Sequence, residues 1–161
     1  MPETFRIFSR EGKLRRPFLL LPVFMAIFLL WPVTTLQNPP WEVQVADSSG
    51  HALGNIAVRL SYQNYSAESE SHEVDAQTDQ NGYAHFQPHY LTASRAQRLA
   101  MTMSSAMAGV HASFGPHAGV FAFGQGLEGG AVENGIIVDW TGSPARMNTP
   151  IIMRPMPEPG H

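Results

Sequence analysis

Histidine, methionine and acidic residues carry the candidate chemistry of this sequence, because cysteine is absent. His85 and His89 are four residues apart, the spacing at which two histidines on one helix face can share a metal. Pro88 lies between them and the segment does not read as helical, so the spacing does not predict a metal site. Alternation with Ala84 and Phe86 instead predicts a strand on which His85 faces solvent.

A second group combines thioether and imidazole side chains, which suit copper in an exported protein. Its members are Met101, Met103, Met107, His111 and His117. Leu99, Met101 and Met103 alternate as in a strand, and methionine fills cores readily. Because no His-x-His or Met-x-x-Met pattern accompanies them, copper binding is an alternative and not the main prediction.

Three other kinds of site lack their motif. No G-x-S-x-G marks a nucleophilic serine, and "GQGLEGG" at residues 124–130 lacks the Walker lysine. Five acids do not match the spacing of a calcium loop and are interpreted as the solvated edge of a sheet. They are Glu68, Glu70, Glu73, Asp75 and Asp79. The sequence therefore assigns no catalytic, cofactor-binding or metal-ligating residue.

The charge distribution argues against a nucleic-acid partner. The chain has 161 residues and a net charge of −3. Five of its ten basic residues fall in the first 16 positions, and the remaining five face 11 acids, which leaves about −6 downstream. Nucleic-acid binding needs a clustered basic surface, which that acidic part lacks.

The N-terminal segment has the pattern of an export signal. Residues 1–16 form a basic flank, predicted to be cytoplasmic, and residues 17–34 an apolar stretch, predicted to be a transmembrane signal-anchor. No Ala-x-Ala site precedes Val33, which favours an anchor, whereas Pro22 and the shortness of the stretch leave a cleaved signal peptide open. We expect a single-pass protein of a bacterial inner membrane whose domain faces the periplasm, or an exported protein if the signal is cleaved.

The rest of the chain is typical of an all-β domain. Residues 35–40, ending in two prolines, are predicted to be a linker, residues 41–155 a β-sandwich, and residues 156–161 a disordered tail. Inward faces are predicted for Val43 and Val45 of one strand, for Ile56, Val58 and Leu60 of the next, and for Val74 and Ala76 of an edge strand.

Later segments complete this sandwich. Residues 79–82 are predicted to turn before a strand over 83–86, and residues 89–97 to form a loop or short helical turn. Residues 98–114 fit a strand better than a helix, and "GVFAFG", "GIIVDW" and "TPIIM" read as further strands. The prediction is an antiparallel, Ig-like or transthyretin-like β-sandwich of about seven strands, preceded by a transmembrane helix.

The first half of the domain resembles the carboxypeptidase regulatory-like family. The resemblance rests on Val43-x-Val45-x-Asp47 with Gly50, then Leu53, Gly54, Ile56, Val58 and Leu60, then Thr78-Asp79-x-x-Gly82-x-Ala84-x-Phe86. It covers about residues 43–86 and implies a transthyretin-like or prealbumin-like sandwich, usually exported. The tyrosine-arginine-glycine-serine tail of related hydrolases is replaced here by "MRPMPEPGH", so the resemblance does not imply that activity.

These observations predict a membrane-tethered, extracytoplasmic binding or structural module without catalytic activity of its own. The expected partners are the membrane, through residues 17–34, and a protein or glycan. Trp140, Tyr65 and Phe121 are candidate partner anchors and equally candidate core residues. The alternatives are a periplasmic copper-binding protein and an accessory domain that regulates a partner enzyme.

Overall fold

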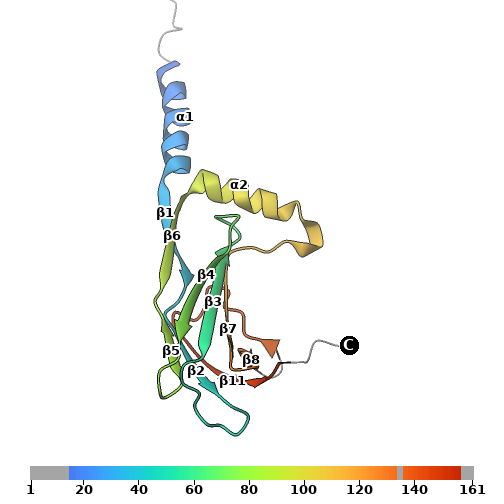
Figure 1. The fold of residues 1–161 in the computed structure, drawn as a ribbon. Helices are drawn as coiled ribbons and strands as arrows, with labels where there is room; N and C mark the ends of the chain where they lie inside the picture. The colour runs from blue at the N-terminus through green and yellow to red at the C-terminus, as the bar shows by residue number, and fades with distance from the viewer. Residues whose placement is uncertain (1–14, 134–135, 157–161) are drawn as a thin grey trace, which may run out of the picture.

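Mostly antiparallel β-sheet makes up the body of the protein in the computed structural model, which describes residues 15–133 and 136–156. Figure 1 shows helix α1 (Arg15–Leu30) standing away from the strands and helix α2 (Arg95–Ala106) lying across the end of the body nearest to it. This architecture agrees with the predicted β-sandwich.

The larger sheet has five strands. Their order is β12 (Arg154–Pro155), β8 (Leu127–Gly130), β7 (Pro116–Gly124), β3 (Ala57–Asn64) and β4 (His72–Gln77). All neighbours are antiparallel. β4 forms one edge, and its acids Glu73 and Asp75 pair with Arg59 of β3 at 2.7 Å each. The prediction of an acidic edge strand is therefore confirmed for β4.

The smaller sheet has the order β11 (Met147–Ile152), β2 (Trp41–Ala46) and β5 (Tyr83–Phe86). β2 and β5 are antiparallel, whereas β11 runs parallel to β2. The prediction of a purely antiparallel sandwich was wrong at this pair. A parallel neighbour needs a long crossover, and no local pattern in the sequence specifies which distant strand it joins.

The core lies between the two sheets. From the smaller sheet, Trp41, Val43 and Val45 are at most 1% exposed, and Val58 and Leu60 of β3 are fully buried opposite them. These residues alternate with exposed or half-buried polar ones, as period-two patterning requires. The predicted inward faces of these strands are confirmed.

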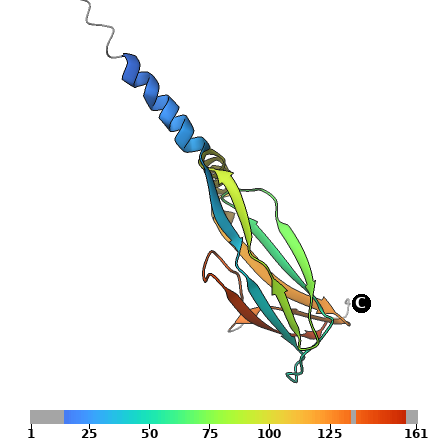
Figure 2. The same ribbon diagram turned by 90° about the vertical axis from the view of Figure 1, so that its left-hand side faces the viewer.

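A ribbon of two strands, β1 (Pro32–Asn38) and β6 (His89–Ser94), joins the body to the foot of α1. Both strands run on into the smaller sheet, β1 into β2 and β6 backwards into β5 (Figure 2). One register connects them, since Asn38 pairs with His89 just as Trp41 pairs with Phe86, and one irregularity falls between Leu36 and Asn38.

This ribbon corrects two expectations. Residues 89–97, predicted to be a loop or helical turn, contain β6 and the start of α2. Residues 35–40, predicted to be a linker, contain the end of β1. The prolines that suggested a linker only separate β1 from β2, because proline removes a hydrogen-bond donor without preventing an extended chain.

Two turns at the end of the body farthest from α1 share one design. Asp47 Oδ1 accepts hydrogen bonds from the amides of Ser49 and His51 at 2.8 and 2.9 Å. Asp79 Oδ1 accepts in the same way from Asn81 and Tyr83, both at 2.9 Å. Each turn is completed by a glycine of positive φ, Gly50 at 84° and Gly82 at 79°. The predicted turn at residues 79–82 is confirmed.

α2 replaces a predicted strand. Residues 98–114 were predicted to be a strand, but residues up to Ala106 belong to α2, and a 3₁₀ turn, η1 (Gly109–His111), follows. Ser94 caps the helix by accepting from the amide of Gln97 at 3.1 Å. This is the S-x-x-Q pattern of a helix start, which outweighs the period-two spacing of the methionines.

The remaining strands are short. β9 (Val132–Glu133) pairs with β10 (Ile136–Ile137), so "GIIVDW" forms only a two-residue strand and an isolated bridge from Trp140 to Ala118. The described residues contain more strands than the predicted seven or so, because β1, β6, β9 and β12 were not expected as separate strands. "GVFAFG" and "TPIIM" lie in β7 and β11 as predicted, apart from Met153.

Within residues 15–133 and 136–156, no helix is long and apolar enough to cross a membrane. α1 covers most of the predicted span at residues 17–34 and contains Pro22. Nearly all of the basic flank, residues 1–14, and most of the predicted tail, residues 157–161, lie outside the described residues.

Candidate functional site

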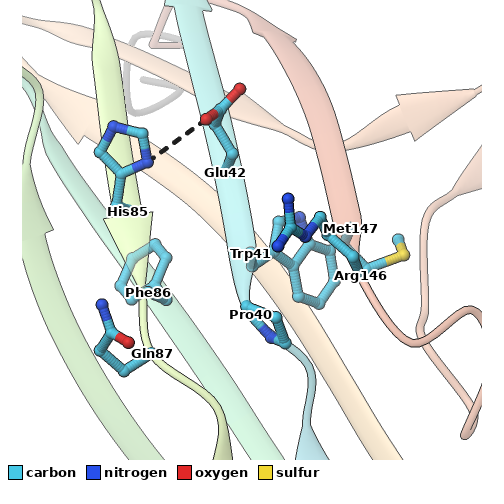
Figure 3. A pocket seen from close by; sticks show the side chains of 8 residues that line it. All are labelled: Pro40, Trp41, Glu42, His85, Phe86, Gln87, Arg146 and Met147. Carbon is cyan, nitrogen blue, oxygen red and sulfur yellow. Dashed lines mark ion pairs between the residues drawn. The ribbon is translucent and has the colours of Figure 1, made fainter.

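A shallow pocket of about 250 Å³ opens where the prolines separate β1 from β2 (Figure 3). Its lining comes from β2, β5 and the start of β11 with their flanking residues. The residues are Pro40, Trp41, Glu42, His85, Phe86, Gln87, Arg146 and Met147. This is where the structure places His85, the first histidine considered from the sequence.

The polar groups of this pocket are accessible. His85 Nδ1 lies 3.5 Å from Glu42 Oε2 across the β2–β5 pair, and their side chains are 59% and 42% exposed. The prediction that His85 faces solvent is therefore confirmed. Such an exposed pair is a weak electrostatic contact, and the aromatic residues Trp41 and Phe86 belong to the buried core.

A second cluster forms where β3, β4 and β6 meet. The ring of Tyr62 is stacked between two imidazoles, with centroids 5.3 Å from His72 and 5.0 Å from His89. His89 Nδ1 lies 2.9 Å from Asn38 Oδ1, so the His89 ring is also held by the β1–β6 ribbon. Burial, and then the nearby negative charge of Glu68, raise the pKa of Tyr62 above its usual value.

Glu68 holds this cluster together. Its Oε2 lies 2.9 Å from His72 Nε2, and its Oε1 accepts from the backbone amide of Asn64 at 2.9 Å and from the side chain of Gln37. The carboxylate is mostly buried, with 14% of the side chain exposed. Because its oxygens are occupied by internal donors, the geometry favours a structural clamp over a ligand or general base.

A third histidine site is centred on His117 of β7, whose Nδ1 lies 2.7 Å from Asp139 Oδ2. Its other nitrogen lies 3.3 Å from the carbonyl oxygen of Phe114, and Tyr65 packs edge-on against the ring. Both ring nitrogens therefore have acceptor partners within the fold. A pocket of about 270 Å³ beside it also contains Ser61.

The Met/His group considered for copper is distributed over three elements. Met103 and Met107 point outward from α2 and its end, with 62% and 88% exposure. Met101 lies toward the other side of the helix, and His111 is in η1. His117 is engaged by Asp139 on β7. In the described part of the chain, no three His, Cys, Asp or Glu side chains form a metal-sized cluster.

The outer surface of the five-stranded sheet carries two neighbouring phenylalanines beside an arginine. We call it the aromatic face and define it by Phe121, Phe123, Arg59 and Gly130. The two phenylalanine centroids are 5.7 Å apart, and the Arg59 guanidinium lies 5.6 Å from the Phe123 centroid. Gly130 pairs with Phe121 across β7 and β8 and contributes no side chain, which leaves a pocket of about 360 Å³ beside the ring.

The three candidate partner anchors separate accordingly. Trp140 is core, with 1% exposure and its indole N–H donating to the carbonyl oxygen of Pro144 at 2.7 Å. Tyr65 is half-buried against His117, and Phe121 is 41% exposed on the aromatic face.

Asn64, the acceptor position of an Asn-x-Ser glycosylation pattern, is 2% exposed and bonded within the fold.

Sequence reasoning missed both the Tyr62 stack and the aromatic face. The stack joins β3, β4 and β6, and β6 was not recognised as a strand. The alternation of Val120 and Ala122 with Phe121 and Phe123 was the available signal for the face, because it puts both phenylalanines on the side away from the core.

No family model and no curated protein matches the chain. Among solved structures, the chain is similar to 3-chlorocatechol 1,2-dioxygenase from Rhodococcus opacus 1CP, with 10% identity and a TM-score of 0.41. The match covers 73% of this chain and spans 59% of the dioxygenase chain. At that level the likeness carries no argument about fold or activity.

Proposed function

We propose that this protein is a membrane-tethered, extracytoplasmic binding module that presents a β-sandwich of the carboxypeptidase regulatory-like type to a protein partner. It has no catalytic activity of its own. The tether is α1, and the partner surface is the aromatic face.

The observation that carries the proposal is the exposure of α1. Eight apolar side chains of this helix are each 52–68% exposed. They are Leu20, Leu21, Val23, Phe24, Met25, Ile27, Phe28 and Leu30. A helix that is apolar all round belongs in an apolar environment, and the sandwich packs against only its foot.

α1 is shorter than an ordinary membrane span, so the proposed tether needs a locally thinner bilayer. Its 16 residues rise about 24 Å at 1.5 Å per residue, against a hydrocarbon core of about 30 Å. Short apolar segments are accommodated by local thinning of the bilayer and by flanking residues that reach the interface. Trp31, 59% exposed at the foot of α1, is the kind of residue that takes such a position.

The aromatic face supports the binding role. Exposed aromatic rings next to arginine are typical of the centres of protein interfaces, and Gly130 leaves room for an inserted side chain. Salt bridges from Arg59 to Glu73 and Asp75 fix the guanidinium over the rings before a partner arrives. The engaged histidines described above support the absence of an activity.

Extraction of the full chain from its native membranes tests the tether. We expect it to remain with the membrane in alkaline carbonate, and a variant with Phe24→Asp and Phe28→Asp to be released. Protease added from the extracytoplasmic side is expected to digest the sandwich of the intact protein. Release of the unaltered chain by carbonate would reject the tether.

Site-specific photo-crosslinking in those membranes tests the aromatic face. A photoreactive residue at position 121 is expected to give one discrete adduct, whereas the same residue at position 44, exposed on the outer side of β2, gives none. Equal adducts from both positions would remove the aromatic face from the proposal.

A further inference from the structure

α2 is held to the body by polar side chains. Gln97 Nε2 donates to the carbonyl oxygen of Ala67 at 3.0 Å, and Ser105 Oγ donates to that of Tyr65 at 3.0 Å. Between them Arg98 donates to the carbonyl oxygen of Val33 at 2.9 Å and to Thr35 Oγ1 at 3.0 Å. The side of the helix that faces the protein is therefore largely polar, the reverse of an ordinary surface helix.

The opposite side of α2 is apolar. Leu99, Met103 and Met107 follow one another at four-residue spacing and so lie in one line along the helix. They are 55%, 62% and 88% exposed, and Val110 beyond the helix is 96% exposed. We call these four side chains the α2 outer face. None of the residues of α2 is acidic.

Helix α2 begins at the foot of α1. Arg95, the first residue of α2, lies with its guanidinium 4.3 Å from the Phe28 centroid and donates to the Phe28 carbonyl oxygen at 3.2 Å. An apolar hollow there is lined by Arg95 with Phe24, Ile27, Phe28 and Trp31. Figure 1 shows α2 running crosswise to α1 from this point.

We propose that the α2 outer face rests on the surface of the lipid bilayer that holds α1, so that the protein contacts the membrane through both helices. This inference rests on the proposed tether. A bilayer whose normal follows α1 presents its interface crosswise at the foot of α1, which is the direction of α2. An apolar stripe on a helix in the interface plane is the usual form of such a contact.

Three features favour lipid over a protein partner at this surface. The helix that carries the stripe starts at the hollow, where Arg95 lies against Phe28 of α1. Trp31 and Arg95 meet at the junction, where aromatic and basic side chains occupy the headgroup level. The polar side of α2 is already used for attachment, which leaves the apolar side chains of the outer face, two of them flexible methionines, to face a fluid surface.

Single-cysteine labelling of the full chain tests the proposal, because the native sequence has no cysteine. Variants Met103→Cys, Val23→Cys and Gln44→Cys carry an environment-sensitive fluorophore after reconstitution into phosphatidylethanolamine–phosphatidylglycerol vesicles. We expect the label at position 103 to shift to the blue, to be quenched by nitroxide lipids and to lose quenching by aqueous iodide. The label at position 44, on the exposed side of β2, is expected to remain open to iodide.

The outcomes separate this inference from the tether. If position 23 is lipid-quenched while position 103 remains open to iodide, the tether stands and the α2 contact is wrong. If position 23 is itself open to iodide, the tether fails and the inference falls with it. Shielding of position 103 that grows with protein concentration, without nitroxide quenching, would assign the surface to a second copy and overturn the proposal.

An added charge provides a second measurement. Met103→Asp, with the label at position 107, is expected to restore iodide quenching, because a carboxylate on the stripe opposes insertion. Gln44→Asp adds the same charge on an exposed strand position and is expected to leave position 107 shielded. Shielding that survives Met103→Asp would contradict the proposal.

Discussion

Strands β2 and β3 and helix α2 place their apolar side chains in opposite directions. β2 and β3 each turn their apolar side toward the core. Trp41, Val45 and Leu60 are almost completely removed from solvent. In α2 the side chains that hold the helix are Gln97, Arg98 and Ser105, and the apolar side is turned outward. One chain thus contains an inward-facing core and an outward-facing apolar surface.

The difference shows that a hydrophobic pattern identifies a face but not what the face contacts. Alternating valines were correctly assigned to a core, because the strands of a sandwich have one dry side. Met101 and Met103 of α2 were assigned to a core for the same reason, but Met103 is 62% exposed and Met101 is only half-buried. The information missing from the pattern is which polar side chains attach the element to its neighbours.

The largest expected effect separates two tryptophans. Trp41→Ala removes a buried ring and its hydrogen bond to Thr149, and we expect a loss of about 3–5 kcal/mol in the free energy of unfolding. Trp31→Ala, at the exposed foot of α1, is the matched control and should leave unfolding of the sandwich unchanged. Denaturant titration followed by circular dichroism measures both, and equal losses would break the comparison between inward and outward apolar residues.

The next effect separates two glycines of nearly equal backbone angle. A Cβ at Gly82 would lie 2.6 Å from the carbonyl oxygen of Val45, whereas a Cβ at Gly50 meets nothing within 4 Å. Gly82→Val should therefore cost about 2–4 kcal/mol, and Gly50→Val only the part due to the positive φ, about 1 kcal/mol. If thermal melts ranked Gly50→Val as the more damaging, the close approach of Gly82 to Val45 would not be what determines the cost of the substitution.

A smaller effect concerns the attachment of α2. Arg98→Ala removes the hydrogen bonds to Val33 and Thr35 and should lower the free energy of local opening of α2 by about 2 kcal/mol. Hydrogen exchange of the α2 amides measures this, with exchange in β3 as the internal reference. Arg146→Ala, an exposed arginine of the Figure 3 pocket, is the control. Unchanged protection of α2 in the Arg98 variant would mean that the helix is not held by its polar side.

The smallest effect is expected at His85. His85→Ala removes an exposed contact with Glu42 and should change the free energy of unfolding by less than about 0.5 kcal/mol. His72→Ala removes a stacked ring and a hydrogen bond to Glu68 and should cost about 1–2 kcal/mol. If the His85 variant were the less stable of the two, the description of His85 as a surface residue and His72 as a structural one would be wrong.

The predictable part of the fold is the part fixed by local chemistry. β2, β3 and β5 follow from alternation, and the turn before β5 follows from Asp79 and Gly82, whose side-chain and backbone roles need no distant partner. The parallel pairing of β11 with β2 and the joining of β1 to β6 depend on residues far apart in the chain. No local pattern carried that information.

The candidate sites follow the same division. The orientation of His85 was predictable because strand alternation alone sets it. The stacking of Tyr62 between His72 and His89 required the relative positions of three strands, one of which had been read as a loop. For α2, the Ser94–Gln97 capping pattern was present in the sequence but was not considered, and the segment was predicted to be a strand.

The extended course of the ribbon also sets a distance. Residues from Pro32 to Ala46 form β1 and β2 with only Pro39 and Pro40 between them. Fifteen extended residues at about 3.3 Å each span up to about 50 Å. The paired strands β5 and β6 run beside them and resist folding back. The two aspartate turns therefore lie at the far end of an extended, paired stretch that starts at the foot of α1.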